Sequence, residues 1–323
     1  MSNSWQKGLL EALERGDGLC IVRMLRERAK PTGALATPVK VEIVRQFQRR
    51  FPAVEERYRL VRWLIESECA AARDLGALMA ATFTGPLWLD DPEEACRIML
   101  GVADDPHWEV REVAPAVVFP ALEVDFEGAF RLLQSWTVHP AENVRRAAAL
   151  VAMRAARERR PEWGPRLLDL IEPLLSDRSE YVRRNLGAFA IGDGFLRCYP
   201  QLTLERLASW AEREDEQVRW NVAMAFSSAE AARYVEAAVS ILGRLAEDER
   251  RYVWRAVASA LRNLGRRVPE QALPVLSTWL QDDRRARPAA VAFRLLGRAT
   301  EAEFIRSSRA SPGRSLRSPA GPA

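Results

Sequence analysis

The chain has 323 residues, 48% of them hydrophobic and 28% charged, which is ordinary for a globular protein of one extended domain or two compact ones. Its four cysteines lie far apart without a CxxC pair and it has only two histidines, which argues against a disulfide framework, a zinc site or a Ser-His-Asp triad, and favours a reducing cytoplasm. The net charge of +4 equals the four arginines of residues 306–323, so the rest of the chain is formally neutral and its charge alone does not indicate nucleic acid.

Residues 1–68 are expected to form an N-terminal helical cap. Their first segment, MSNSWQKGLLEALERGDG, mixes charges with apolar residues, as an amphipathic helix does and a signal peptide does not. The longest uncharged stretch, residues 75–89, contains two glycines and a proline and is too short to cross a bilayer. We therefore expect no membrane association.

The strongest signal is an internal repeat between residues 69 and 305. One phrase recurs, with a polar turn, an aliphatic residue and then a basic or aromatic residue, as in HPAENVRRAAAL and SDRSEYVRRNLGAF. Its small aliphatic residue recurs every 33 to 38 residues, at Ala72, Val110, Val144, Val182, Val218, Val253 and Ala286. Such a period predicts about seven stacked helix pairs, because a lone pair cannot bury both of its apolar stripes.

The predicted fold is therefore all-α: a HEAT-like repeat α-solenoid, a right-handed superhelix of antiparallel helix pairs. Each repeat phrase predicts a helix, and a second apolar helix precedes it, as at residues 128–137, 202–211 and 237–246. The variable spacing and the absence of a Trp-Leu-Gly-Tyr pattern argue against tetratricopeptide repeats. Asp105, Asp177 and Asp248 are expected to cap the repeat helices.

Arginines recur directly after the repeat aliphatic residue, with a second arginine beside some of them. One interpretation is a stripe that follows a phosphate backbone, and the other is an Asp–Arg ladder that joins neighbouring repeats. The candidate phosphate-binding residues are Arg111, Arg145, Arg146, Arg183, Arg184 and Arg219, and Arg287 continues the row.

Comparison between repeats divides four of the tryptophans into core residues and partly exposed residues. Trp136 and Trp210 occupy positions where other repeats have leucine, which indicates core. Trp220 and Trp254 stand where other repeats have arginine, which indicates a partly exposed surface suited to base stacking or to ordinary coverage of the groove. Asn221, on the apolar stripe, suggests an inter-repeat hydrogen bond.

Asp193, between two glycines, is the candidate catalytic acid. A carboxylate there could stabilise the sugar cation that develops when a cationic alkylpurine leaves DNA. A solvated turn aspartate is the alternative.

The phrases WTVHPAENVRRAA, RRPEW, LLSDRSEYVRRNLGAFAIGD and LASWAE, in this order over residues 100–215, resemble the bacterial HEAT-like alkylpurine DNA glycosylase superfamily, in its alkylation-repair branch. The resemblance implies a concave DNA-binding groove, removal of cationic N-alkyl purines, and no cofactor or metal. It also implies that Trp163, after the Arg-Pro segment, and Asp193 contact the damaged nucleotide. In three places the sequence departs from that pattern: Leu150 and Val151 replace an acid and a glycine, the proline-rich segment is reduced to RRPEW, and Gly192 replaces the asparagine before Asp193.

Two functional hypotheses follow. The first is a monomeric protein that binds duplex DNA, possesses or has lost glycosylase activity, and uses Trp163, Trp220 and Trp254 on the substrate. The second is a non-catalytic scaffold that grips a protein partner in its concave groove. The Ser/Pro/Gly/Arg-rich residues 306–323 are expected to be disordered.

Overall fold

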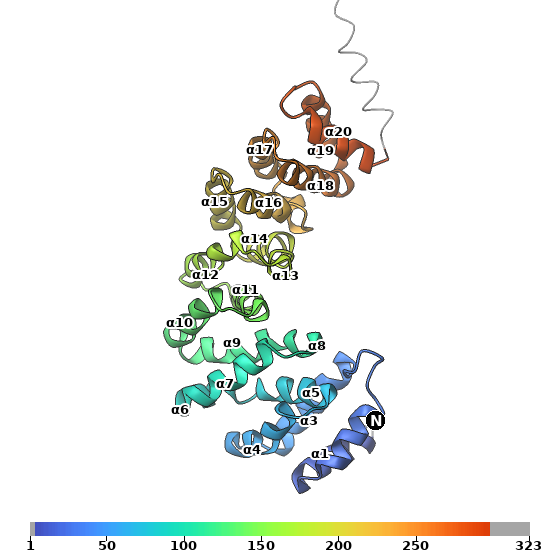
Figure 1. Ribbon diagram of the computed structural model, residues 1–323, viewed down its shortest axis with the longest axis vertical. Helices are drawn as coiled ribbons and strands as arrows, with labels where there is room; N and C mark the ends of the chain where they lie inside the picture. Colours follow the sequence, from blue (N-terminus) through green and yellow to red (C-terminus); the bar gives the residue numbers. More distant parts are fainter. Residues whose placement is uncertain (1–3, 298–323) are drawn as a thin grey trace, which may run out of the picture. The chain divides into compact units, whose positions relative to one another are not determined.

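The computed structural model describes residues 4–297, and within that range the regular secondary structure is entirely helical (Figure 1). Helix after helix follows in antiparallel pairs, which confirms the predicted all-α repeat. No helix within these residues is long and apolar enough to cross a membrane. The expected tail at residues 306–323 lies outside the described residues.

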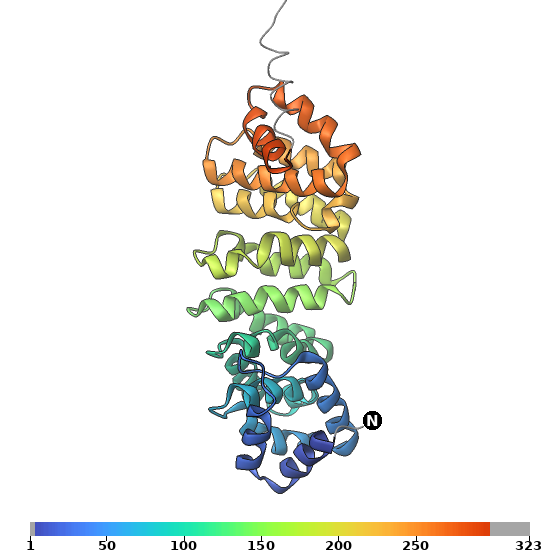
Figure 2. The same ribbon diagram turned by 90° about the vertical axis from the view of Figure 1, so that its right-hand side faces the viewer.

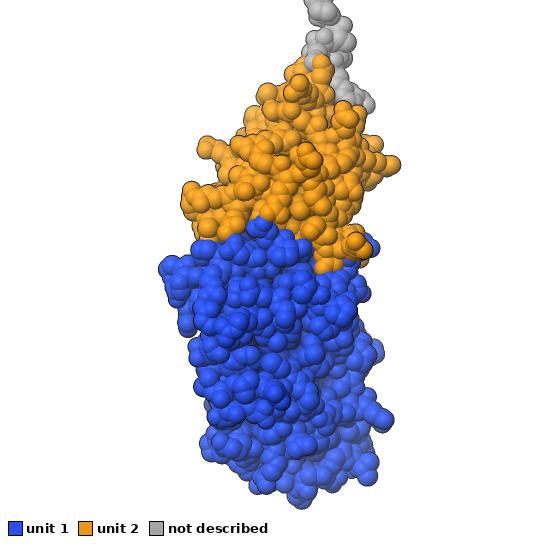
Figure 3. All heavy atoms as spheres, turned by 60° about the vertical axis from the view of Figure 1, so that its left-hand side comes forward, with its two compact units in different colours: residues 1–174, 179–182 blue, residues 175–178, 183–323 orange. Residues whose placement is uncertain are grey.

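The chain divides into two compact units (Figure 3): unit 1 comprises residues 1–174 and 179–182, and unit 2 comprises residues 175–178 and 183–323. Unit 1 contains α1 (Ser4–Arg15), α2 (Gly18–Arg26), α3 (Thr37–Arg50), α4 (Val54–Ile65), α5 (Ala70–Ala80), α6 (Thr84–Asp90), α7 (Pro92–Ala103), α8 (Trp108–Arg111), α9 (Ala114–Val124), α10 (Phe126–Thr137), α11 (Glu142–Ala156) and α12 (Trp163–Ile171). The boundary between the units falls within the segment that contains a 3-10 turn (Glu172–Ser176) and α13 (Glu180–Arg183).

The N-terminal helices of unit 1 are tied to its repeats by buried charge. Lys40 of α3 and Asp74 of α5 form a 2.7 Å ion pair in which the carboxylate is fully buried. Burial raises the pKa of Asp74, and the hydrogen bond from Lys40 lowers it only in part. The loop before α3 is held by Glu109 of α8, which pairs with Lys30 at 2.6 Å and accepts a hydrogen bond from Thr32. The expected helical cap is thus packed on the repeats.

Unit 2 contains a π-helix (Leu186–Phe195), α14 (Leu196–Cys198), α15 (Pro200–Ala211), α16 (Glu216–Ala225), a 3-10 turn (Glu230–Arg233), α17 (Val235–Leu245), α18 (Arg251–Arg267), α19 (Pro269–Leu280) and α20 (Ala286–Leu295). In Figure 1, α15 and α17 lie on one side of this unit and α16 and α18 on the other. Figure 2 shows α16 and α18 side by side, so consecutive repeat helices form one layer.

The repeat residues form the core that the periodicity predicts. Six of the seven small aliphatic positions are at most 2% exposed, the exception being Ala286 in the last described helix: Ala72, Val110, Val144, Val182, Val218 and Val253. Trp136 and Trp210 are 2% and 1% exposed, which confirms that they are core residues. Asn221 is fully buried and donates from Nδ2 to the Leu175 carbonyl at 2.8 Å, which confirms an inter-repeat hydrogen bond.

The expected helix caps are wrong for Asp105 and Asp248. Each carboxylate accepts from the backbone N–H two residues ahead, His107 for Asp105 (2.7 Å) and Arg250 for Asp248 (2.9 Å), and these donor residues lie just before the first residues of α8 and α18. An aspartate five residues before the repeat aliphatic residue is too far from the first turn to cap it. These acids instead close the inter-helix turn and leave an oxygen for arginine.

Candidate nucleic-acid interface

The arginine that follows the repeat aliphatic residue folds back onto its own inter-helix turn. Its guanidinium donates to the carbonyls six and five residues earlier, with respective distances of 2.9 and 3.0 Å for Arg73, 2.7 and 3.1 Å for Arg111, and 2.8 and 2.9 Å for Arg145. Arg183 repeats the pattern at 3.4 and 2.6 Å, and Arg219 donates from Nε to the earlier carbonyl at 2.6 Å. We name these five residues the turn arginines. They stabilise the turns by supplying donors to carbonyls that helix geometry leaves unpaired.

Two turn arginines also bridge to the next repeat. Arg73 donates to Asp105 at 2.7 Å, and Arg219 donates to Asp248 at 2.8 Å. Burial raises the pKa of Asp248, but hydrogen bonds from Arg250 and Arg219 outweigh it and hold that pKa at about 2. At these two positions the geometry is that of the inter-repeat ladder.

The neighbouring arginines of the row differ in exposure. Arg146 is 6% exposed, pairs with Glu112 at 2.5 Å, and lies over the Tyr181 ring at 4.8 Å. Its guanidinium therefore faces the packed interior of unit 1 and not solvent. Arg184 is exposed.

Trp163, the tryptophan that the family resemblance assigns to substrate, lies in the packing between α10 and α12. Its side chain is 3% exposed, its ring stacks on Phe126 with centroids 4.6 Å apart, and the Arg160 guanidinium lies 4.3 Å from its centroid. In this conformation the indole contacts protein on its faces, and substrate contact remains a prediction.

Asp193 lies within the π-helix (Leu186–Phe195). This form is rare in proteins as a whole, but where it occurs it is often at a functional site. The helix approaches α16 closely: a Cβ at Gly187 would lie 2.7 Å from that of Met224, and a Cβ at Gly192 would lie 2.5 Å from the Ala225 carbonyl oxygen. Asp193 Oδ1 is inaccessible and has no hydrogen-bond partner among the described residues. An unpaired buried carboxylate oxygen is costly and commonly marks a functional position.

Trp220 is half-buried and forms an aromatic pair with Tyr252, a residue that the comparison between repeats did not single out. Its ring stacks on that of Tyr252, with centroids 5.5 Å apart and planes 10° apart. The pair lines a pocket of about 570 Å³, together with Arg251, Arg255, Met224, Ala256 and Ser259. Aromatic faces beside guanidinium groups are what base stacking and phosphate contact require. Trp254 is half-buried too but lines a different pocket.

α18 supplies the positive charge of this surface. It contains five arginines and no acidic residue, and Arg251, Arg255, Ser259, Arg262 and Arg266 follow one stripe of the helix. Arg251, Arg255 and Arg266 are exposed, and no ion pair joins them to any residue in the described part of the chain. We name this stripe, with Trp220 and Tyr252, the α18 face.

The sequence reasoning missed most of this face. It followed arginines at the repeat position, whereas Arg251 and Arg255 lie two residues before and two residues after Val253. The signal was present in RYVWRAVASALRNLGRR, where arginines recur at helical spacing without one acid.

The stacked helix pairs define a helical-repeat protein. One of its faces carries arginines and aromatic side chains and is a candidate surface for binding an anionic ligand. Residues 23–190, just over half of the chain, match the family described as DNA alkylation repair enzyme, and the chain belongs to that family. The α18 face lies beyond the matched residues. Among the described residues, no cluster of His, Cys, Asp and Glu could hold a metal ion.

No curated protein matches the sequence. An engineered protein of known crystal structure is similar over 93% of this chain and 82% of its own, with 17% identity and a TM-score of 0.35. Computationally designed armadillo repeat proteins for modular peptide recognition are similar over 68% of this chain and 98% of their own, with 18% identity and a TM-score of 0.32. Likeness at this level carries no argument about function.

Proposed function

We propose that this member of the DNA alkylation repair enzyme family binds duplex DNA through the α18 face. The observation that carries the proposal is the row of exposed, acid-free arginines beside the stacked Trp220–Tyr252 pair. Arginines without carboxylate partners keep their charge for phosphates, and an accessible aromatic face beside them can contact a base or a sugar. Family membership supplies the class of ligand, because alkylation repair acts on DNA.

The turn arginines contribute less to this proposal than their number suggests. Arg111, Arg145 and Arg183 donate to turn carbonyls, and Arg219 is also paired with Asp248. Their use inside the scaffold favours the second candidate, a helical-repeat scaffold for a protein partner. The two functions differ in whether the exposed arginines of α18 confer DNA affinity.

A fluorescently labelled duplex titrated with the full chain at low salt tests the proposal. We expect the double variant Arg251→Ala/Arg255→Ala to bind at least about tenfold more weakly, since each arginine lost removes a phosphate contact. Arg244→Ala is the matched control, because Arg244 is 53% exposed, lies on α17 and pairs with Glu212. Equal binding by the double variant and the control would leave only the scaffold candidate.

Excision of an alkylated purine is the second part of the proposal, with Asp193 as the group that stabilises the developing sugar cation. The support for it is the unpartnered Oδ1 within a π-helix. We expect Asp193→Asn to lose release of methylated purine from alkylated DNA by about a hundredfold or more while DNA affinity stays unchanged. Release by the variant at the wild-type rate would remove Asp193 from the chemistry.

A further inference from the structure

One repeat lacks its turn arginine, and a pocket lies at that position. The residue after Val253 is Trp254, where Arg73, Arg111, Arg145, Arg183 and Arg219 stand in other repeats. Counting back five and six residues from Trp254 gives Glu249 and Asp248, whose carbonyls correspond to those that receive a guanidinium elsewhere. No described side chain donates a hydrogen bond to either carbonyl oxygen. An indole has one N–H on a rigid ring and cannot fold back as arginine does.

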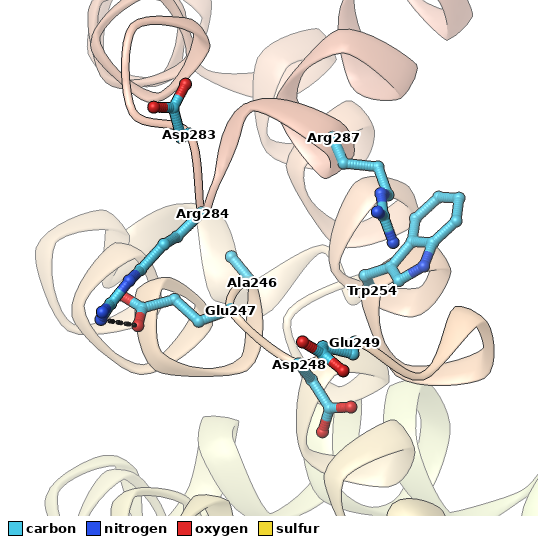
Figure 4. Close-up of a pocket in the computed structure, with 8 residues that line it drawn as sticks. All are labelled: Ala246, Glu247, Asp248, Glu249, Trp254, Asp283, Arg284 and Arg287. Carbon is cyan, nitrogen blue, oxygen red and sulfur yellow. Dashed lines mark hydrogen bonds and ion pairs between the residues drawn. The ribbon is translucent and has the colours of Figure 1, made fainter.

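The pocket at this position has a volume of about 430 Å³ and is lined by Ala246, Glu247, Asp248, Glu249, Trp254, Asp283, Arg284 and Arg287 (Figure 4). Arg287, the next residue of the row, does not fill the vacated position. Its guanidinium points toward Trp254 in Figure 4, with its central carbon 5.7 Å from the ring centroid. The space that a guanidinium occupies in other repeats is therefore open here.

The lining carries four carboxylates and two arginines, and three further arginines, Arg219, Arg250 and Arg285, pair with two of these carboxylates. Glu247 is paired with Arg284 at 3.3 Å and Arg285 at 2.7 Å, and Asp248 is paired with Arg219 and Arg250. Glu249 is exposed and forms no ion pair with any residue between positions 4 and 297. It remains available to a cation that enters the pocket.

We infer that this pocket accepts the arginine side chain of a bound polypeptide segment. The entering guanidinium would donate to the Asp248 and Glu249 carbonyls as a turn arginine does, with the Glu249 carboxylate as its charge partner and the Trp254 ring beside its stem. A planar fork of donors suits two adjacent carbonyls better than the compact ammonium of lysine does. The pocket and the α18 face would thus recognise opposite charges.

The probe that tests the inference is N-acetyl-arginine-methylamide, titrated into the full chain by calorimetry. We expect saturable binding with one site, and at least about tenfold weaker binding of the citrulline analogue, whose uncharged urea replaces the guanidinium. Equal binding of the two probes, or no binding of either, overturns the inference.

Trp254→Arg is the decisive variant. It restores the turn arginine, so we expect it to abolish probe binding and to raise the midpoint of thermal unfolding. Glu249→Gln, a change at an exposed residue, should weaken probe binding severalfold even if Trp254→Arg does not fold. Trp220→Arg, which lies on the α18 face, is the matched control and should bind the probe as wild type does. Wild-type probe affinity in Trp254→Arg would contradict the inference.

Two further measurements are needed. One shows whether the bound arginine belongs to this chain or to another protein, and the other separates the inference about the pocket from the proposal of DNA binding. If the bound arginine belongs to this chain, replacement of Arg306, Arg309, Arg314 and Arg317 by glutamine will tighten probe binding, and if it belongs to another protein, probe binding will not change. Trp254→Arg should keep wild-type affinity for duplex DNA. The inference about the pocket can therefore be refuted while the proposal of DNA binding is supported, and the reverse.

Discussion

A single carboxylate, Asp248, joins two repeats and one turn of unit 2. It accepts from Arg219 at 2.8 Å, from the Arg250 guanidinium at 2.6 Å and from the Arg250 backbone N–H at 2.9 Å, and only 3% of its side chain is exposed. These bonds favour the ionised form, so the pKa of Asp248 in the folded protein is about 2, below its ordinary value of 3.8. The contribution to stability is complete above the ordinary pKa and is lost as the pH falls through about 2.

Asp248→Asn should therefore lower the free energy of unfolding by about 2–3 kcal/mol at pH 7, which is the shift in pKa multiplied by about 1.4 kcal/mol per unit. The difference from wild type should shrink as the pH approaches 2. Urea unfolding followed at several pH values measures it, with Glu249→Gln as the adjacent unpaired control. Equal unfolding free energies at pH 7 would show that the ladder contributes nothing at this step.

Residue-scale roles were only partly predictable from the sequence. The repeat comparison identified Trp136 and Trp210 as core and Asn221 as an inter-repeat donor. It could do so because equivalent positions in different repeats have similar surroundings, so the residues found at one indicate the burial of the others. It could not show that the turn arginines fold back onto carbonyls, since that depends on side-chain conformation. Trp163 was assigned to the substrate by the family resemblance alone, and its burial against Phe126 is visible only in three dimensions.

At the scale of elements, the π-helix and α16 approach so closely that two glycines are required. A Cβ at Gly187 would lie 2.9 Å from the Asn221 carbonyl oxygen, and a Cβ at Gly192 would lie 2.5 Å from the Cβ of Ser228. Both obstacles are backbone or Cβ atoms, which cannot move without shifting the backbone of α16 or of the turn that follows it.

We expect Gly187→Ala and Gly192→Ala each to destabilise unit 2 by about 1–3 kcal/mol, although alanine is the better helix former. Gly101→Ala in α7 is the matched control, because nothing lies within 4 Å of the added methyl group, and it should stabilise by up to about 1 kcal/mol. Thermal unfolding monitored by circular dichroism measures all three. A stabilising effect at Gly187 or Gly192 would mean that the two helices do not pack this closely.

The helices themselves were predicted well, since periods of 33 to 38 residues and a 3.6-residue apolar pattern are properties of the chain alone. The π-helix was not, because a π-helical turn leaves no distinct local pattern in the sequence. The α18 face was missed for a different reason. Its arginines lie between the repeat positions that the comparison followed.

Across residues 4–297, arginine occurs in two separate settings. The turn arginines stabilise the repeat scaffold, whereas the exposed arginines of α18 have no acid on their helix and no ion pair in the described chain. Family membership and this surface together support action on DNA. The tryptophan that replaces one turn arginine then opens a pocket of opposite preference in the same unit.

The salt dependence of duplex binding tests the central claim most directly. Plotted as log affinity against log salt concentration, the slope for Arg251→Ala/Arg255→Ala should be shallower than that of wild type by about two, since each phosphate contact contributes about 0.9 to its magnitude. Arg244→Ala should leave the slope unchanged. A double variant with the wild-type slope would contradict the assignment of DNA contacts to the α18 face.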